Sequence, residues 1–246
     1  MVGAPWCDEV VVVDSGSTDA TGDIARASAD VYRMEPWRGY SKQKQFGVSL
    51  ARNEWVLILD GDEEVSSVLS QELGALDAKT LAALDVVAMP RRNYLLGQPV
   101  RAWWPDVQTR LIHRERAQWA DEVLHDARVP GTQSRMRTLR GPLEHKRVGG
   151  GWSDYFGGQR LDARLLETAW QMHDRGKRVG FGGLWLRPRF AFFKFYVLKR
   201  GFLDGSFGLL VAQKAQVSTQ LKYAALWAVQ EGHAGPKTNS NVTPRA

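Results

Sequence analysis

Two stretches decide the fold: Val10–Asp19, which reads VVVVDSGSTD, and Glu54–Glu64, which reads EWVLILDGDEE. Each is a short apolar run that ends in an acidic turn, as is typical of a buried strand followed by a loop. The patterns around them predict helices of about ten residues, and strands that alternate with such helices form βαβ units. The chain is therefore expected to be an α/β protein with a mostly parallel sheet.

The rest of the chain extends this pattern. The expected strands are residues 9–13, 30–34, 54–59, 85–90 and 108–113, and the expected helices are residues 20–29, 41–52, 66–76, 153–173, 187–203 and 207–230. The expected N-caps are Thr18 or Asp19, Ser41, and Ser66 or Ser67. Gly149–Gly151 is expected to be a hinge, so the chain divides into an α/β domain (1–148), a helical segment (149–232) and a polar, disordered tail (233–246).

Composition excludes several classes of protein. With 246 residues, 43% of them hydrophobic and 24% charged, the chain can bury a core and is not expected to be disordered. Cys7 is the only cysteine, which excludes an intrachain disulfide and a cysteine zinc site. A membrane-spanning helix needs about twenty apolar residues, and the longest uncharged run is Gly205–Gln213. The N-terminus lacks the pattern of a signal peptide.

Acidic side chains follow two of the expected strands. Asp14 ends the first, and Asp60 and Asp62 follow the third. Ligands of open α/β sheets bind at the carboxyl ends of the strands. Two carboxylates in a D-x-D spacing can hold a hard divalent cation, with phosphate oxygens of a substrate and water as its other ligands. The motif taken alone is more often an ordinary turn, and its position after a buried strand favours the metal site.

Longer motifs carry a family resemblance. They are VVVVDSGSTDATGDIA, PWRGYSKQKQFGVSLARNEWVLILDGDEEV, PRRNYLLGQPVRAWWPDVQTRLIHR, Leu124–Asp126 and Gly141–His145. In this order and spacing they resemble the family 2 glycosyltransferases, most closely the bacterial branch that adds a glucose-type residue to the lipopolysaccharide inner core. The resemblance implies a glycosyltransferase-A fold (Rossmann-like) with a C-terminal helical segment. It also implies an inverting hexosyltransferase that uses a nucleotide-sugar donor, with a UDP-sugar expected, and a divalent metal, Mg or Mn.

The resemblance also assigns roles to residues. The donor-binding residues would be Asp14, Ser15, Gly16, Ser17, Asp19, Lys44, Asp60 and Arg110, and the metal ligands would be Asp62, Asp60 and His145. Arg91 and Arg92 could assist Arg110 at the phosphates. Glu63 would contact the metal ligands without binding the metal itself, or would simply interact favourably with the dipole of the following helix. Many relatives have two successive acids where this chain has Asp14-Ser15.

The catalytic base is expected in the segment around residue 124. An inverting transferase needs a carboxylate that takes the proton of the acceptor hydroxyl. The resemblance places this role on Asp126, with Glu122 as the second candidate. Relatives mostly have His-Glu where this chain has His125-Asp126, so its carboxylate is one methylene shorter.

Relatives usually begin with a strand that would precede Glu9. Without that strand, the one beginning at Glu9 is expected to lose a neighbour, and the chain alone to be poorly folded or inactive. The alternative function is an inactive or truncated homologue that binds a nucleotide or a glycan.

The segment 185–207 combines aromatic and basic residues. Its aromatics are Trp185, Phe190, Phe192, Phe193, Phe195, Tyr196, Phe202 and Phe207, and its cations are Arg187, Arg189, Lys194, Lys199 and Arg200. Such a segment can lie in an anionic membrane surface, or it can pack against the catalytic domain. We expect a lipid-linked saccharide acceptor and a peripheral location on the inner, cytoplasmic face of the cytoplasmic membrane. No nucleic-acid partner is expected, because the aromatics cluster with apolar residues.

Overall fold

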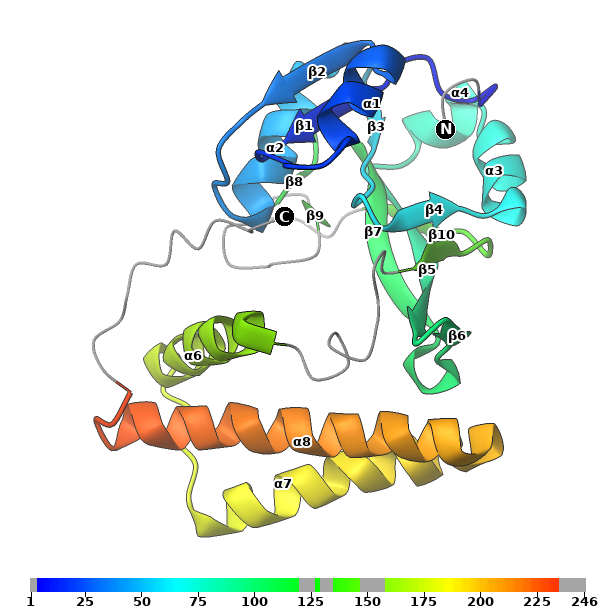
Figure 1. Ribbon diagram of the computed structural model, residues 1–246. Helices are drawn as coiled ribbons and strands as arrows, with labels where there is room; N and C mark the ends of the chain where they lie inside the picture. The colour runs from blue at the N-terminus through cyan, green and yellow to red at the C-terminus, as the bar shows by residue number, and fades with distance from the viewer. Residues whose placement is uncertain (1–3, 120–126, 129–134, 147–157, 235–246) are drawn as a thin grey trace. The chain divides into compact units, whose positions relative to one another are not determined.

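The computed structural model describes residues 4–119, 127–128, 135–146 and 158–234 (Figure 1). By internal contacts, the described residues divide into a sheet unit (4–92 and 105–146) and a helical unit (93–104 and 158–234). Among the described helices, none is long and apolar enough to cross a membrane.

The sheet unit alternates strands and helices through its first half. Its elements are β1 (Val11–Asp14), α1 (Thr21–Ser28), β2 (Val31–Met34), α2 (Tyr40–Leu50), β3 (Trp55–Leu57), β4 (Glu63–Val65), α3 (Ser67–Gly74), α4 (Ala78–Ala82), most of β5 (Val86–Leu95), β7 (Asp106–His113), β8 (Gln118–Trp119), β9 (Ala127–Arg128), β10 (Met136–Thr138) and β11 (Leu143–His145). The helical unit contains β6 (Gln98–Pro99), η1 (Arg101–Trp103), α6 (Gly158–Asp174), α7 (Phe181–Phe193), a π-helical turn η2 (Lys194–Leu198), a 3-10 turn η3 (Gly201–Asp204) and α8 (Gly205–Gln230).

The main sheet is mixed, which corrects the expectation of a mostly parallel one. It has seven strands, five of them in the order β3–β7–β5–β11–β4, with β6 and β10 also paired to β5. The pairs β1–β2 and β5–β10 are parallel, whereas β3–β7, β5–β7, β5–β6, β4–β11 and β8–β9 are antiparallel. Parallel neighbours need a crossover connection, but only residues 96–105 join β5 to β7. The α/β class and the C-terminal helices are confirmed.

Strands β1 and β3 each have one strand partner among the described residues. β1 pairs with β2 in a separate two-stranded sheet, and β3 pairs with β7 at the end of the main sheet. β1 is only partly buried along Val11–Val13 although every residue there is valine. Helix α2 packs on β1, where a Cβ added at Gly47 would lie 3.5 Å from a methyl group of Val13.

Two apolar clusters hold helices on the main sheet. One joins Leu69 and Leu73 of α3 to Val87 and Met89 of β5. The other joins Val48 of α2 to strand residues that include Val86 and Ile112.

A glycine lets the chain leading to β11 approach α3 closely. A Cβ added at Gly141 would lie 2.3 Å from the backbone nitrogen of Leu69, so any larger residue would push α3 away. The sheet unit therefore depends on this glycine for the seating of α3.

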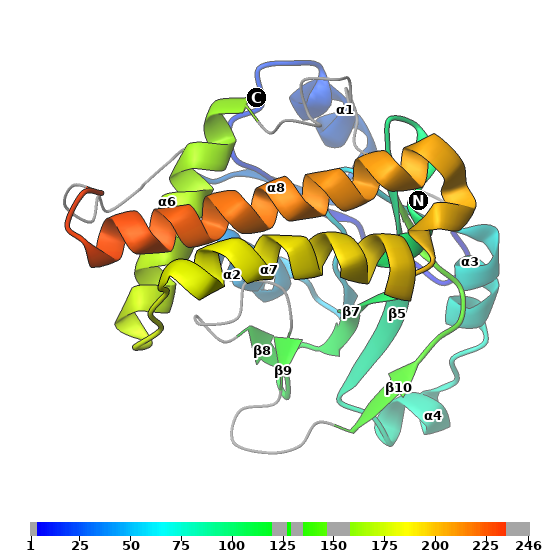
Figure 2. The same ribbon diagram turned by 90° about the horizontal axis from the view of Figure 1, so that it is seen from below.

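Three helices build the helical unit, and α7 and α8 lie side by side in both Figure 1 and Figure 2. Ala169 of α6 packs with Leu226 and Val229 of α8. The expected single helix over 187–203 is wrong, because α7 begins earlier and gives way to η2 and η3. The break lies at Arg200, whose φ of 55° is left-handed. Near it a Cβ added at Gly208 would lie 1.8 Å from the Gly201 carbonyl oxygen, so α8 can begin this close only with glycine.

The helix starts agree in part with the expected caps. Ser66 caps α3, where its hydroxyl accepts the N–H of Leu69. Ser41 does not cap α2, because that helix already begins at Tyr40 after Gly39. The N-cap of α1 is Ala20, although Asp19 still accepts the N–H of Thr21 through its carboxylate at 3.0 Å.

Asp85 gives the sheet unit a pH dependence. Its nearly buried carboxylate accepts hydrogen bonds from Arg135 at 2.7 Å and lies 3.1 Å from Arg116. The hydrogen bonds from Arg135 lower the pKa of Asp85 from 3.8 to about 2. Because the folded-state pKa is lowered, this stabilisation is complete above about pH 4 and is lost as the pH falls through about 2.

Replacing Asp85 with asparagine is therefore expected to lower the free energy of unfolding by about 2 kcal/mol at neutral pH. It should also flatten the fall in stability between about pH 4 and pH 2. Urea unfolding at a series of pH values measures both effects, with exposed Asp8→Asn as the control. An unchanged pH profile would show that Asp85 does not titrate differently in the folded chain.

Candidate functional site

The acidic turn after β3 is held by reciprocal hydrogen bonds between its first and fourth residues. The N–H of Asp60 donates to the Glu63 carboxylate at 3.1 Å, and the N–H of Glu63 donates to the carbonyl of Asp60 at 3.0 Å. These two bonds fix a four-residue turn in which Asp60 and Asp62 are presented by one loop. Since Glu63 begins β4, the sheet itself positions this turn.

Glu63 is the buried centre of the charge cluster. None of its side chain is exposed, and its carboxylate accepts hydrogen bonds from Arg110 at 2.6 Å and from Arg91 at 3.2 Å. Arg91 also pairs at 2.7 Å with Asp106, the residue directly opposite it on β7. A buried charge is tolerated only when it is paired and hydrogen-bonded, and Glu63 meets that condition with two arginines.

Two cations hold Asp60. Its carboxylate lies 3.0 Å from Nζ of Lys44 and accepts a hydrogen bond from Arg110 at 2.6 Å. Burial alone would raise the pKa of Asp60, but Arg110 and Lys44 outweigh it and hold that pKa below its usual value. Burial and the nearby Arg110 lower the pKa of Lys44. The cluster thus keeps an ionised carboxylate between two nearly buried cations.

Arg110 has hydrogen-bonding capacity left. Its side chain is 2% exposed, and its Nη2 serves both Asp60 and Glu63. Its Nε and Nη1 have no hydrogen-bond partner among the described residues. Buried guanidinium donors without acceptors are costly.

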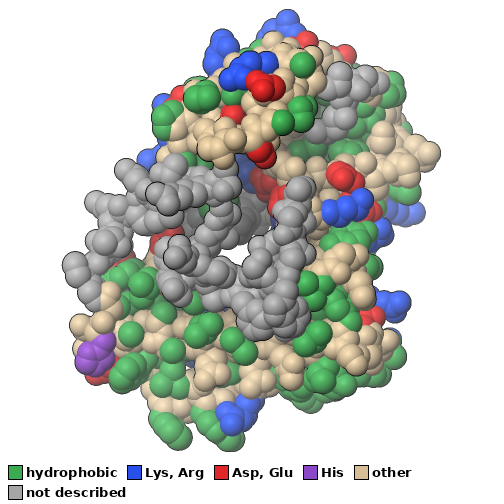
Figure 3. Space-filling view, in the orientation of Figure 1, with side chains coloured by type: hydrophobic (Ala, Val, Ile, Leu, Met, Phe, Trp, Pro, Cys, Tyr) green, Lys and Arg blue, Asp and Glu red, His purple; other side chains and the backbone are tan. Residues whose placement is uncertain are grey.

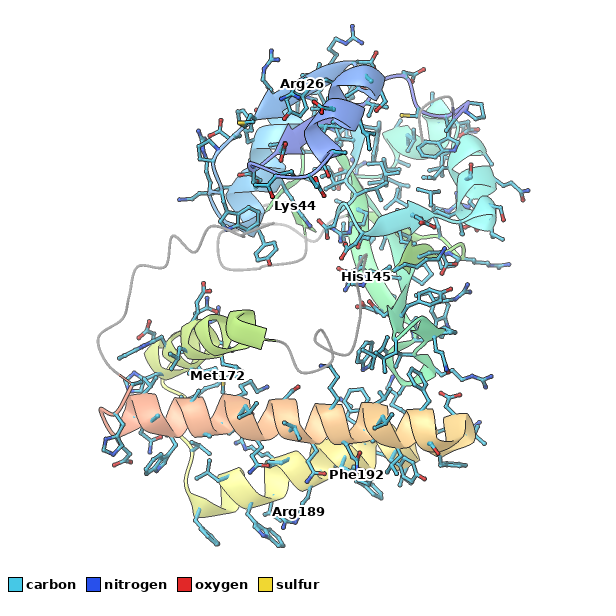
Figure 4. The ribbon with its side chains drawn as sticks, in the orientation of Figure 1. Arg26, Lys44, His145, Met172, Arg189 and Phe192 are labelled. Atoms are coloured by element: carbon cyan, nitrogen blue, oxygen red, sulfur yellow. The ribbon has the colours of Figure 1, made fainter. Side chains whose placement is uncertain are left out.

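Asp62 pairs with a histidine instead of a cation of this cluster. Its Oδ2 lies 3.1 Å from Nε2 of His145, which is on β11. The hydrogen bond to His145 is the main reason that the pKa of Asp62 is lowered. Lys44 and His145 are both labelled in Figure 4, where they come from different elements of the sheet unit.

Asp62 and His145 fit a divalent metal. A carboxylate oxygen and an imidazole nitrogen are both common ligands, and their separation of 3.1 Å suits two ligands of one ion. Among the described residues, no group of three or more His, Cys, Asp and Glu could hold a metal ion. A metal at this pair would therefore need further ligands, such as the phosphate oxygens of a substrate. Asp60, the third expected ligand, is engaged by Lys44 and Arg110.

The loop after β1 is organised by Asp14. Its nearly buried carboxylate accepts the N–H groups of Gly16 and Ser17, the Ser17 hydroxyl and the Tyr32 hydroxyl, at 2.8 to 3.1 Å. These bonds lower the pKa of Asp14 although burial opposes them. The buried Asp14 side chain thus fixes the conformation of the loop by hydrogen bonds, whereas Ser15 and the loop backbone lie nearer the surface.

Helix α2 links this loop to the acidic turn. Gln43 donates to the Ser15 hydroxyl at 3.0 Å, and the next residue, Lys44, contacts Asp60. Two neighbouring residues of one helix therefore tie together the ends of β1 and β3. Sequence reasoning missed Gln43.

The structure brings many of the expected site residues together in the sheet unit. Lys44, Asp60 and Arg110 are in contact, as are Asp62 and His145. The expected base Asp126 and its alternative Glu122 lie outside the described residues.

Arg91 and Arg92, which were expected to assist Arg110, each have a carboxylate partner. Arg91 pairs with Glu63 and Asp106, and Arg92 pairs with Glu144 at 2.7 Å. Sequence reasoning named Glu63 but did not recognise it as the buried partner of Arg110 and Arg91. Its position three residues after Asp60, where a tight turn closes, is the signal that could have indicated this.

Comparison with known proteins identifies the family. The model of glycosyl transferase family 2 matches residues 7–132, which include β1, the acidic turn and Arg110. The chain belongs to glycosyltransferase family 2. As a member of this family it is a transferase that moves a sugar, and the match spans every charged residue of the cluster above.

Relatives of this glycosyltransferase cover different shares of it. It is 29% identical over 243 residues to the lipopolysaccharide core biosynthesis glycosyltransferase LpsC of Rhizobium meliloti, covering 90% of this chain and 83% of LpsC. An uncharacterized glycosyltransferase of Rickettsia conorii is 50% identical over 122 residues, 47% of this chain and 42% of that protein. The crystal structure of S. aureus TarS 1-349 aligns over 91% of this chain and 82% of that chain, at 15% identity and a TM-score of 0.35.

Proposed function

We propose that this glycosyltransferase moves a hexose, with inversion, from a nucleotide-sugar to a lipid-linked saccharide of the lipopolysaccharide core type. The observation that carries the proposal is the cation pair Lys44 and Arg110 at the acidic turn. A diphosphate offers oxygens that lysine and arginine side chains bind. The similarity to LpsC over most of the chain supports the acceptor class.

Asp62 and His145 would hold the divalent metal, Mg or Mn. When bound there, the ion would neutralise charge that builds up on the departing diphosphate. The loop from Asp14 to Asp19 would contact the nucleotide part of the donor. The proposed donor is a UDP-sugar. Ser15, whose hydroxyl accepts a hydrogen bond from Gln43 of α2, would exchange hydrogen bonds with a base or ribose hydroxyl.

The reaction needs one proton transfer. The acceptor hydroxyl oxygen forms a bond to the anomeric carbon on the face opposite the diphosphate. The bond from that carbon to the diphosphate oxygen breaks, and its electron pair leaves with the nucleoside diphosphate. The proton of the hydroxyl passes to a carboxylate, for which Asp126 is proposed and Glu122 is the second candidate. An acceptor anchored in lipid would place this reaction at the inner face of the cytoplasmic membrane.

The test is release of nucleoside diphosphate by the purified chain with a panel of nucleotide-sugars, Mn²⁺ or Mg²⁺, and lipopolysaccharide core acceptor. Acceptor-dependent release together with an acceptor of increased mass would support the proposal. Cooperative thermal unfolding would show that the chain is folded. Tight donor binding by such a chain, without any release of nucleoside diphosphate, would favour the alternative of a binding protein.

Replacing Asp126 with asparagine is expected to lower the turnover number by at least about 10²-fold with little change in donor affinity, because a base acts in the transition state. Glu122→Gln is the matched control and should have the smaller effect. Donor affinity that falls as much as turnover would make Asp126 a binding residue. A larger loss in Glu122→Gln would exchange the two roles.

A further inference from the structure

The outer side of the α7 segment is apolar and exposed. We define the α7 face as Phe181, Trp185, Leu186, Phe190, Phe193, Val197, Leu198, Phe202 and Leu203. Each of these side chains is between 42% and 86% exposed. Phe181, Trp185, Leu186, Phe190 and Phe193 lie on α7, where Phe181 and Trp185 are four residues apart, Leu186 and Phe190 four, and Phe190 and Phe193 three, spacings that place side chains on one side of a helix. The other four residues lie in the turns η2 and η3 that follow α7. Exposed apolar surface of this extent on consecutive turns is a mark of an interaction site.

The opposite side of α7 is already packed. Pro188 and Ala191 are buried, Leu184 packs with the cluster of α6 and α8, and Phe195 packs with a second cluster around Val211. The helix is therefore apolar on both sides, although only one of them is covered. Exposed apolar side chains in this number are typical of an interaction surface, so we expect the α7 face to have an apolar partner.

The charges around the α7 face are almost all positive. The cations of this segment are Arg189, Lys194, Lys199, Arg200 and Arg187, of which Arg187 donates to the Tyr223 hydroxyl of α8 at 2.6 Å. The one acid between residues 181 and 207 is Asp204, whose side chain is only 16% exposed and pairs with Arg101 at 3.1 Å. Green side chains and a blue group lie along the lower edge of the helical unit in Figure 3. The partner of this surface is therefore expected to be anionic as well as apolar.

One cation of this segment lies against an aromatic side chain of the α7 face. The Arg189 guanidinium lies 4.0 Å from the centre of the Trp185 ring, and Arg189 projects from the outer side of α7 in Figure 4. A tryptophan with its ring against a cation suits the boundary between acyl chains and head groups, where one part of the pair is apolar and the other is charged.

We propose that the α7 face binds the surface of an anionic lipid bilayer, with its apolar side chains at the acyl boundary and its cations on the lipid head groups. A second copy of this chain suits the surface less well. In a symmetric dimer the same patch meets itself, so Lys194, Lys199 and Arg200 of each copy would meet like charges. The inference concerns the protein's own contact with lipid and holds whether or not the proposed sugar transfer is correct.

The test is co-sedimentation of the full chain with vesicles of phosphatidylcholine, or of phosphatidylcholine mixed equally with phosphatidylglycerol. We expect binding to the mixed vesicles, weakened strongly at about 1 M salt, where the screening length is about 3 Å. Lys194→Glu and Lys199→Glu should each weaken binding by at least about fivefold, since a cation near such a surface contributes about that factor. Phe190→Ser and Phe193→Ser should each weaken it by about tenfold.

Matched controls lie on the sheet unit. Lys79→Glu and Ile24→Ser change an exposed cation and an exposed apolar side chain, and neither should alter vesicle binding. Quenching of tryptophan fluorescence by brominated lipid gives a second measurement on the unsubstituted chain, and Trp185→Phe should reduce it. No binding to the mixed vesicles by folded protein would overturn the inference, as would binding that ignores these substitutions. A concentration-dependent dimer that Phe190→Ser abolishes, without vesicle binding, would assign the face to a second copy and also overturn it.

Discussion

Replacing Asp62 with asparagine is expected to lower sugar transfer by about 10³-fold while the sheet unit stays folded. The carboxylate of Asp62 is about one third exposed and pairs only with His145 in the contacts described above, so its loss leaves no buried cation without a partner. An amide oxygen carries no net charge and is a weaker ligand for a hard cation. A metal that stabilises a departing diphosphate contributes several kcal/mol, and each 1.4 kcal/mol changes the rate about tenfold.

The measurement is product formation at saturating donor over a series of Mn²⁺ concentrations. Direct titration of Mn²⁺ into the protein with a nucleoside diphosphate present should show weaker binding in Asp62→Asn. Asp23→Asn, an exposed acid that pairs with Arg26 on α1, is the matched control and should change neither quantity. Full turnover in Asp62→Asn, or a loss without any change in metal affinity, would contradict the assignment of Asp62.

The contrast between Asp60 and Asp62 shows how far the sequence determined the site. Their spacing after a buried strand predicted that both lie at the edge of the sheet, and the structure presents both on one turn. The sequence could not predict that Asp60 faces Lys44 and Arg110 whereas Asp62 faces His145. The direction of each carboxylate depends on the turn that Glu63 closes, which is a property of the folded chain.

The sequence did not predict the charge cluster around Glu63, for a related reason. Arg91 and Arg110 lie 28 and 47 residues from Glu63, and they reach it because β5 and β7 pair with Arg91 opposite Asp106. A shift of that register by one residue would turn the arginine side chains to the other face of the sheet. Local patterns predict where a strand occurs, but they do not determine which strand lies beside it.

Helix α7 shows the same limit in a different form. Aromatic and basic residues predicted a surface segment, but the sequence did not indicate which aromatics face outward. Phe190 and Phe193 are exposed, whereas Phe195 packs in the cluster around Val211. The left-handed residue Arg200 interrupts the segment 187–203, which was expected to be a single helix. A left-handed residue that is not glycine leaves little trace in a sequence pattern.

Glu63 carries the second large effect. Replacing it with leucine is expected to lower the free energy of unfolding by about 3–5 kcal/mol, which is the usual loss when one partner of a buried ion pair is removed. Arg110 would keep only Asp60 and Arg91 only Asp106, and the N–H of Asp60 would lose its acceptor. Because the side chains of Glu63 and Arg110 are buried, solvent cannot replace the missing carboxylate at Arg110.

Glu64 provides the matched control, because it is the next residue of β4 and carries the same charge at the surface. Its side chain is 65% exposed and pairs with Lys146, which is also exposed, so Glu64→Leu should change the free energy of unfolding by less than about 1 kcal/mol. Glu63→Gln should fall between the two leucine variants, since its amide oxygen still accepts hydrogen bonds from an arginine but carries no charge. Urea unfolding of the three variants provides the comparison. Equal stability of Glu63→Leu and Glu64→Leu would mean that Arg91 and Arg110 do not depend on Glu63 for their neutralisation, and the cluster would then be held by Asp60 and Asp106.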